Sequence, residues 1–517
     1  MLGFQERLIG KQERLEIKTE DFMSNFHTTV SRRDFMKALG LAGVGFGAAG
    51  AAAPVLHDLD EVTASPQATF KRPWWVKERD FGDPTVEVDW DLIEPFDDRN
   101  DLWNANTAFA RYVGIEEVKR LGNLCTERQK QGIINNTPGL TLRDNALDGG
   151  SRVFAANLMP IAGLKSWVGF PKGAYGSPIT TPGYYGVPKW QGTPEENTRM
   201  LRAAMRFYGA SQIGVSELGA KEKKLIYSHH SQGRPFVYED VDEGYETTEK
   251  LVIPNKPLWI VSIAIQMSRE NFRQGIGNIK QAANMNRYRI HTIVQGCTQQ
   301  FLRQLGYHGM GYPDSFYGAM PANADSIMTG LAEMARNNKF CNSPEYGSIC
   351  GYFSLITDLP LAPTPPIDAG MFRFCHTCRK CAEACPSQAI SYESEPSWDI
   401  PPVAAYPNIP NLTAVGGKRV FFTDSVNCKI YHYQTPGGCG TCMGTCVFNT
   451  NPAASVHEVI KSTVSTTPIF NGFFYNMSKI FDYGITPDEE KEGWWDLSLP
   501  VLGQQSTIGA FDGGYSK

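Results

Sequence analysis

Eight of the 12 cysteines in this 517-residue chain fall in two runs near its C-terminus, and their spacing constrains the fold more than any other feature. The first run is Cys375-x2-Cys378-x2-Cys381-x3-Cys385, followed by Pro386. This spacing is the bacterial signature of a [4Fe–4S] cluster, in which three close thiolates bind one cubane and the fourth binds the cubane of a second run. The first run therefore predicts a ferredoxin-type module that transfers single electrons.

A second run supplies the partner that this signature requires. It reads Cys428-x10-Cys439-x2-Cys442-x3-Cys446, with a longer first gap and Val447 where the signature has proline. Because the fourth cysteine of each run crosses to the other cluster, the sequence predicts two mixed ligand sets. The first cluster is assigned to Cys375, Cys378, Cys381 and Cys446, and the second to Cys385, Cys428, Cys439 and Cys442. Zinc sites and disulfides are the alternatives, and two paired four-cysteine runs disfavour both.

The N-terminal segment 31–37, SRRDFMK, has the form of a twin-arginine export signal, and a Gly/Ala-rich apolar stretch, 38–53, follows it. That stretch is shorter than the roughly 20 apolar residues of a membrane-spanning helix. Residues 1–53 are therefore predicted to be a signal segment, with Met23 as an alternative start, because export does not need the charged residues 1–22. This route exports folded proteins, so thiolates already bound to iron are not free to form disulfides outside the cytoplasm.

The chain is long enough to hold more than an electron carrier. Its 517 residues suffice for two or three domains, and 42% are hydrophobic. The net charge of −5 and the pI of about 6.0 give no sign of nucleic-acid binding. After the signal segment we expect a loop-rich N-terminal region at 54–191, an α/β domain at 192–365, the two-cluster module at 366–455 and a C-terminal extension at 456–517.

Secondary-structure signals are clearest after residue 192. Thr193, Pro194 and Glu196 form a helix start with a capping box, and Gly209 marks the end of that helix. The sequence further predicts strands over 211–215 and 259–267, a helix over 295–305, a proline-rich linker at 361–366, and two helices over 456–481 with a break at 467–468. Strands that alternate with helices predict an α/β sandwich between 192 and 365.

Longer stretches add a family resemblance that covers nearly the whole chain. They are the twin-arginine segment, both cysteine runs, GTPEENTRM at 192–200, TDLPLAPTPPIDAG at 357–370 and TTPIFNGFFY at 466–475. With these, the chain resembles the respiratory reductive dehalogenases of organohalide-respiring bacteria, particularly the Dehalococcoides chloroethene-type enzymes. The resemblance implies an α+β fold, with a nitroreductase-like α/β corrinoid-binding domain followed by a bacterial-type two-cluster ferredoxin module.

The same resemblance implies the chemistry and the partners. Family members bind a cobalamin-type corrinoid base-off, and they replace a carbon-bound halogen of a small organohalide by hydrogen. They work at the outer face of the cytoplasmic membrane with a small integral-membrane anchor subunit and a membrane electron-donor complex. The chain lacks the Asp-x-His-x-x-Gly motif of many cobalamin proteins, which agrees with base-off binding, so no histidine is assigned to cobalt. No corrinoid-contacting residue is assigned.

One catalytic residue follows from the resemblance. Counting without gaps from 253–255 to 305–307 places the family's proton-donating tyrosine on Tyr288. The carbon that loses halide must be protonated; a free tyrosine has a pKa of about 10, and a nearby positive charge favours its ionised form. Arg287 and Arg289 flank Tyr288.

Two departures from the family pattern keep alternatives open. Gly351 stands where the family has a basic residue before its TDLP-type segment, and the segment 309–329, expected to line the pocket, diverges. A non-catalytic iron–sulfur electron carrier is therefore one alternative. An epoxyqueuosine reductase-like enzyme, which uses the same cofactors on tRNA, is the other; the export signal and the acidic pI oppose it.

Overall fold

The computed structural model describes residues 72–153, 166–172, 177–313, 316–449, 455–481 and 483–504. The chain divides after Thr69, and all described residues belong to the unit Phe70–Lys517. The α/β region and the cysteine-rich region therefore pack within one unit, and the boundaries predicted between them stay predictions. The twin-arginine segment and Met23 lie outside the described residues.

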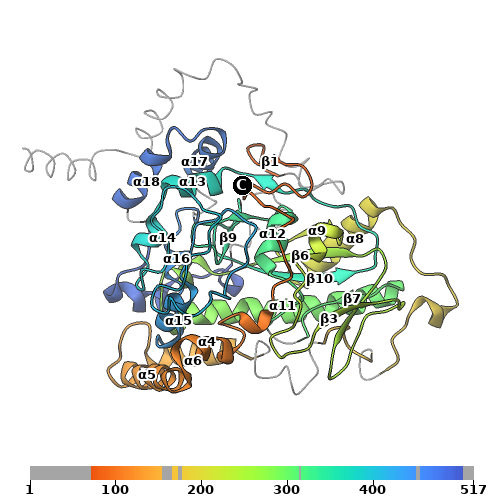
Figure 1. Ribbon diagram of the computed structural model, residues 1–517, viewed down its shortest axis with the longest axis horizontal. Helices are drawn as coiled ribbons and strands as arrows, with labels where there is room; N and C mark the ends of the chain where they lie inside the picture. Colours follow the sequence, from red (N-terminus) through yellow and green to blue (C-terminus); the bar gives the residue numbers. More distant parts are fainter. Residues whose placement is uncertain are drawn as a thin grey trace, which may run out of the picture. The chain divides into compact units, whose positions relative to one another are not determined.

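A four-stranded antiparallel sheet forms the centre of the α/β region (Figure 1). Its strands, in spatial order, are β2 (Gln212–Glu217), β6 (Trp259–Gln266), β10 (Cys350–Thr357) and β7 (Gly309–Met310). The strands predicted at 211–215 and 259–267 are confirmed as β2 and β6. In β10, Gly351 pairs with Ile265 and Phe353 with Ile263.

The two faces of this sheet differ in chemistry, because successive side chains of a strand point to opposite sides. Val215, Ile263 and Phe353 belong to an apolar core shared with helices α8 (Pro194–Tyr208) and α11 (Asn278–Leu305). The other face packs on α12 (Ala322–Met328) and carries buried polar groups such as Ser262. Helix α8 has the predicted ends: Thr193 Oγ1 accepts from Glu196 N at 3.2 Å, and Gly209 has φ +119°.

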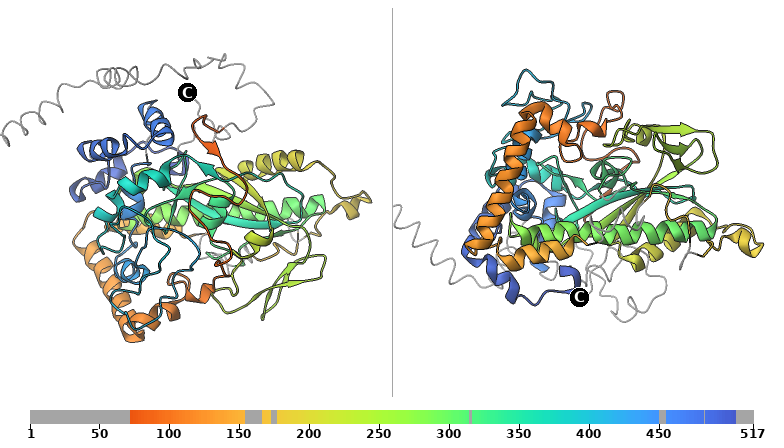
Figure 2. Two further views of the ribbon diagram at one scale, coloured as in Figure 1. Left: turned by 45° about the horizontal axis from the view of Figure 1, so that its top comes forward. Right: turned by 90° about the horizontal axis from the view of Figure 1, so that it is seen from below.

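Helix α11 is longer than the sequence predicted. The prediction at 295–305 captured only its last third, although Gly306 ends it as expected, with φ +88°. The earlier part was missed because polar side chains, among them Asn286 and His291, lie on its buried face and interrupt the apolar pattern. With 28 residues the helix is about 42 Å long. Figure 2 shows it in green, running from the cysteine-rich region to the sheet.

The expectation of a loop-rich N-terminal region is wrong for 106–151. This stretch forms α4 (Asn106–Val113), α5 (Ile115–Ile134) and α6 (Leu142–Ser151). In α5 only Val118, Leu121 and Gly132 are buried, so its apolar stripe is too narrow to predict a helix of 20 residues. Helix α6 packs on α11.

Short helices carry the two cysteine runs. They are α13 (Met371–Thr377), α14 (Lys380–Glu383), α15 (Ser425–Tyr433) and α16 (Thr441–Gly444). Helices α17 (Ser455–Thr466) and α18 (Asn471–Ile480) pack on α13 and confirm the two helices and the break predicted for 456–481. The linker 361–366 contains no helix or strand and is held along α8 and β2, where Thr364 N donates to Val215 O at 2.8 Å.

The remaining elements are short. They are β1 (Lys77–Glu78), β3 (Phe236–Glu239), β4 (Tyr245–Glu246), β5 (Leu251–Pro254), β8 (Glu333–Met334), β9 (Cys341–Asn342), β11 (Ile367–Asp368), α9 (Ala220–Lys223), α10 (Arg269–Phe272), and the 3-10 helices η1 (Asp98–Asn100), η3 (Pro182–Tyr185), η4 (Asp488–Asp496) and η5 (Val501–Gly503). Within the described ranges, no helix has both the length and the apolar character needed to cross a membrane.

Candidate active site and cluster centres

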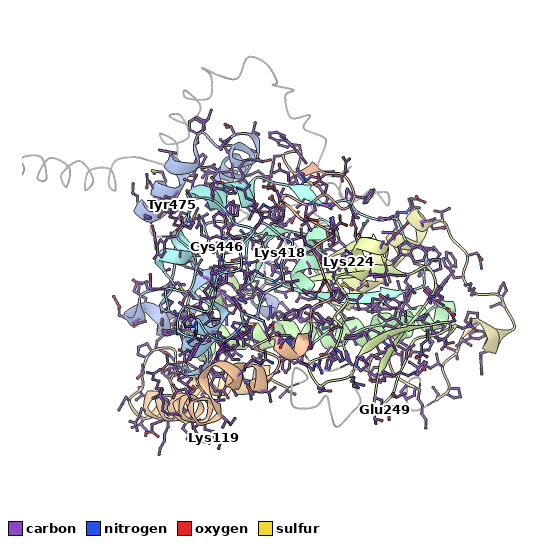
Figure 3. The ribbon with its side chains drawn as sticks, in the orientation of Figure 1. Lys119, Lys224, Glu249, Lys418, Cys446 and Tyr475 are labelled. Carbon is purple, nitrogen blue, oxygen red and sulfur yellow. The ribbon has the colours of Figure 1, made fainter. Side chains whose placement is uncertain are left out.

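The structure brings together the four cysteines assigned to the first cluster. Burial raises the pKa of the Cys375 thiol, and repulsion from the thiolates of Cys378 and Cys446 raises it further. The thiol of Cys381 interacts in the same way with the other three. Cys446 and Tyr475 of α18 pack against one apolar core, which also contains Cys378 (Figure 3). The fourth cysteine of the second run therefore lies with the first run, as the crossed assignment predicts.

The other four assigned cysteines form a second group. Burial raises the pKa of the Cys442 thiol, and the thiolates of Cys439, Cys428 and Cys385 raise it further. Cys385, Cys428 and Cys442 also pack around one small apolar core together with Cys381. Both groups thus have the composition that two cubanes need, and they are neighbours.

Neither group has the geometry of a single-ion site. Among the described residues, no three His, Cys, Asp or Glu side chains gather closely enough to hold one metal ion. The remaining cysteines belong to neither group and are Cys125, Cys297, Cys341 and Cys350.

Polar contacts fix the backbone that carries the second group. Asp424 caps α15 and accepts from the main-chain nitrogens of Val426 and Asn427 at 3.0 and 2.9 Å, which sets the turn before Cys428. Burial lowers the pKa of His432 to about 3, so its ring is neutral. His432 Nδ1 therefore accepts from Cys439 N, at 3.1 Å.

Tyr288 lies on α11 and is half-buried against the apolar core under the sheet. Its hydroxyl accepts a hydrogen bond from Arg287 Nη2 at 2.9 Å, and the guanidinium carbon lies 4.6 Å from the centre of the Tyr288 ring. The rings of Phe316 and Phe353 meet it edge-on, with centroids at 4.7 and 5.6 Å. Phe316 comes from the segment 309–329, which the sequence expected to line the pocket.

The basic partner of Tyr288 comes from the helix and not from β10. A Cβ atom at Gly351 would lie only 2.5 Å from Cδ of Arg287, so the glycine makes room for this side chain. The second flanking residue, Arg289, instead donates to Asn286 Oδ1. The sequence left the choice between the two arginines open, and the structure places Arg287 on the phenol. The sequence could not show that Arg287 packs against Gly351, because the two residues lie far apart in the chain, on α11 and β10.

Two other tyrosines near this site, Tyr317 and Tyr312, have different surroundings. Tyr317 Oη donates to Trp103 O at 3.1 Å. Burial raises the pKa of Tyr312 well above its usual range. The hydroxyl of Tyr288, by contrast, is hydrogen-bonded by the cationic side chain of Arg287. This contact orients the phenol and places a positively charged group beside its oxygen.

The residues around Tyr288 also leave a donor for a bound group. Arg287 Nε is buried and has no hydrogen-bond partner within the described ranges. A buried N–H without a partner costs free energy, so a ligand that accepts from it is favoured. The site therefore fits a bound cofactor or substrate next to the phenol.

The class of the protein follows from its cysteine groups and from one domain match. Residues 374–449 match the "4Fe-4S double cluster binding domain", so this region is a module for two iron–sulfur clusters. The protein is thus an iron–sulfur oxidoreductase. Residues 71–361 match the family described as "Reductive dehalogenase subunit". The chain belongs to the reductive dehalogenase family, which confirms the resemblance seen in the sequence.

Individual relatives agree with this assignment. A chloroethene reductive dehalogenase of Dehalococcoides mccartyi strain VS is 33% identical over 542 residues, which cover 93% of this chain and 99% of the relative. A trichloroethene reductive dehalogenase of another Dehalococcoides mccartyi strain is 31% identical over 582 residues, with the same coverage. These relatives are reductive dehalogenases matched over nearly their full length, whereas an epoxyqueuosine reductase of Bacillus subtilis matches over only 27% of this chain. The comparisons therefore disfavour both the non-catalytic carrier and the epoxyqueuosine reductase-like alternative.

A solved structure supports the fold class. A variant of the catabolic reductive dehalogenase NpRdhA superposes with a TM-score of 0.54 at 19% identity. The alignment covers 79% of this chain and 49% of that one, so this chain spans about half its length. At this identity the likeness shows a shared fold, and it confirms the predicted α+β arrangement of a dehalogenase domain followed by a two-cluster module.

Proposed function

We propose that this reductive dehalogenase is exported and reduces small chlorinated hydrocarbons, chloroethenes first among them, with a base-off corrinoid as its reactive cofactor. The observation that carries the proposal is the 2.9 Å hydrogen bond from Arg287 to Tyr288. It gives the site a phenol poised to release a proton. Two relatives that each match 93% of this chain are named for chloroethene and trichloroethene, which supports this substrate class.

The reaction consumes two electrons and one proton, breaks a carbon–halogen bond, forms a carbon–hydrogen bond and releases halide. When bound, a corrinoid would supply the redox chemistry that cleaves the carbon–halogen bond. Tyr288 Oη delivers the proton to the carbon. Arg287 orients the phenol and stabilises the phenolate until solvent reprotonates it. Phe316 and Phe353 hold the phenol ring and limit access of water.

Helix α11 supports electron delivery from the cysteine-rich region to this site. Lys280, near its start, donates to Gly437 O of the second cysteine run at 2.6 Å. Tyr288 lies two turns further along the same helix, about 12 Å by the helix rise. The cluster assigned to Cys385, Cys428, Cys439 and Cys442 is therefore the one we place next to the corrinoid. The other cluster would receive electrons first.

Anaerobic reconstitution with corrinoid tests the proposal. The protein should contain about eight iron atoms and one cobalt atom, as two cubanes and one corrinoid require, and it should release chloride from chlorinated ethenes with reduced viologen as donor. Chlorinated benzenes serve as the comparison substrates. Iron without cobalt, or a loaded protein that dechlorinates neither class, would contradict the proposed function.

Single cysteine variants test the ligand assignment in the same preparation. Cys378→Ser and Cys442→Ser should each lower the iron content, because each removes a thiolate of one cluster. Cys125→Ser is the matched control, since Cys125 lies on α5 outside both groups, and its iron content should equal that of the wild type. Four iron atoms in the wild type, or full iron in both variants, would overturn the assignment.

We further propose twin-arginine export to the outer face of the cytoplasmic membrane, a small integral-membrane anchor subunit, and a membrane electron-donor complex, with no nucleic-acid partner. The support is the motif around Arg32 and Arg33. Replacing both by Lys should retain the precursor in the cytoplasm, whereas a chain that starts at Met23 should be exported normally. Cell fractionation measures both, and export of the double-lysine variant would contradict the proposed route.

A further inference from the structure

Arg336, which follows β8, has a fully buried side chain, 0% exposed. Its Nε donates to Cys375 O at 3.0 Å and to Cys378 O at 2.9 Å, and its Nη2 donates to Cys375 O at 2.6 Å and to His376 O at 3.4 Å. Its Nη1 donates to the carbonyls of Ser391 and Glu393, both at 2.8 Å. All three nitrogens are therefore used, and all of these acceptors are main-chain carbonyls.

These contacts tie the first cysteine run to the chain that returns after it. An arginine presents its donors in a rigid planar fork, so six such bonds fix the positions of the carbonyls as well as the side chain. Two of the carbonyls belong to cysteines assigned to the first cluster, Cys375 and Cys378. A smaller or more flexible donor in this place would hold the same loop less firmly.

The charge of Arg336 lacks a carboxylate in these contacts. None of the six hydrogen bonds goes to a carboxylate, and the guanidinium carbon lies 4.0 Å from the centre of the Phe421 ring. The anions that act on it are the thiolates of Cys375, Cys381 and Cys378. A buried charge is costly unless an opposite charge compensates it. The cluster that these thiolates bind is the compensating anion for Arg336.

We infer that Arg336 raises the reduction potential of the cluster held by Cys375, Cys378, Cys381 and Cys446 while it holds the main chain at two of these ligands. The inference rests on the proposed ligand assignment. Reduction adds one electron to an already negative cluster, breaks no bond and moves no proton. A fixed positive charge in surroundings of low dielectric constant stabilises the reduced state most. Arg336 is thus a positioning residue for electron entry.

A redox titration followed by electron paramagnetic resonance tests the inference on the anaerobically purified enzyme. Arg336→Gln removes the charge and should move the midpoint potential of one of the two cluster signals to a more negative value, leaving the other nearly unchanged. Arg336→Lys keeps the positive charge but loses the planar guanidinium group, so the midpoint potential should stay closer to the wild-type value. Equal shifts in both variants, or no shift in either with full iron content, would overturn the role of the charge.

Two further measurements keep the outcome decisive. Arg303→Gln is the matched control, because Arg303 donates to the carbonyls of Phe170 and Val168 at 2.5 and 2.7 Å, on α11 about 35 Å beyond Lys280. Both of its cluster signals should keep their potentials. If Arg336→Gln fails to assemble one cluster, Arg336→Lys decides: a bound cluster near the wild-type potential supports the inference, and loss of that cluster overturns it. Fewer than eight iron atoms in the wild type would contradict the ligand assignment instead.

Discussion

Replacement of Tyr288 by Phe is expected to lower dechlorination by roughly 10²–10⁴-fold, the usual contribution of a general acid. The change removes only the hydroxyl that accepts from Arg287 Nη2. The ring keeps its edge contacts with Phe316 and Phe353, so packing should survive. Steady-state turnover with reduced viologen measures the loss. Iron and cobalt contents should match the wild type, and cobalt should remain reducible, because the electron steps do not use this proton.

Tyr317→Phe is the matched control for this experiment. It removes the hydroxyl of a neighbouring tyrosine. That hydroxyl donates to Trp103 O, so turnover should change little. Near-normal turnover in Tyr288→Phe would move the proton source elsewhere, to Tyr312, Tyr317 or a water molecule. Loss of corrinoid from Tyr288→Phe would instead make this tyrosine a packing residue.

The parts of the fold that the sequence predicted are those whose signals are local. The cysteine spacing depends on a few neighbouring residues, and the structure brings the cysteines of the two runs close together, while their division between two clusters stays a prediction. Both ends of helix α8 were predicted because Thr193 caps its N-terminus and Gly209 caps its C-terminus through contacts within one turn of the helix. The strand β6 was predicted because its apolar run is continuous and buried.

The parts that the sequence missed depend on partners far along the chain. The start of α11 was hidden by polar residues such as Asn278 and Lys280, which can be buried there because their side chains donate to Gln129 Oε1 and Gly437 O. The partner of Tyr288 was undecided for the same reason. Which of the two flanking arginines reaches the phenol depends on the space above Gly351, and Gly351 lies on a strand that follows much later in the chain.

That space makes Gly351→Ala a sharp test of how Arg287 acts. If the site lacked a charge, Gly351→Arg would raise activity; if a flanking arginine supplies that charge, it would not. In the structure Arg287 supplies the charge, and any Cβ at 351 would meet its Cδ at 2.5 Å. The flexible arginine would yield before the sheet does, so its bond to Tyr288 should break while the fold remains.

Gly351→Ala is therefore expected to reduce turnover by about 10–100-fold, since a hydrogen bond to a charged group contributes about 1.5–3 kcal/mol. Arg287→Gln should cause a similar loss. In a Tyr288→Phe background neither change should repeat this loss, because the hydroxyl that Arg287 bonds is already gone. Arg289→Gln is the control on the same helix, since Arg289 bonds Asn286, and it should stay near wild-type turnover. Additive losses in the double variants, or higher activity in Gly351→Arg, would show that Arg287 does not act through the phenol.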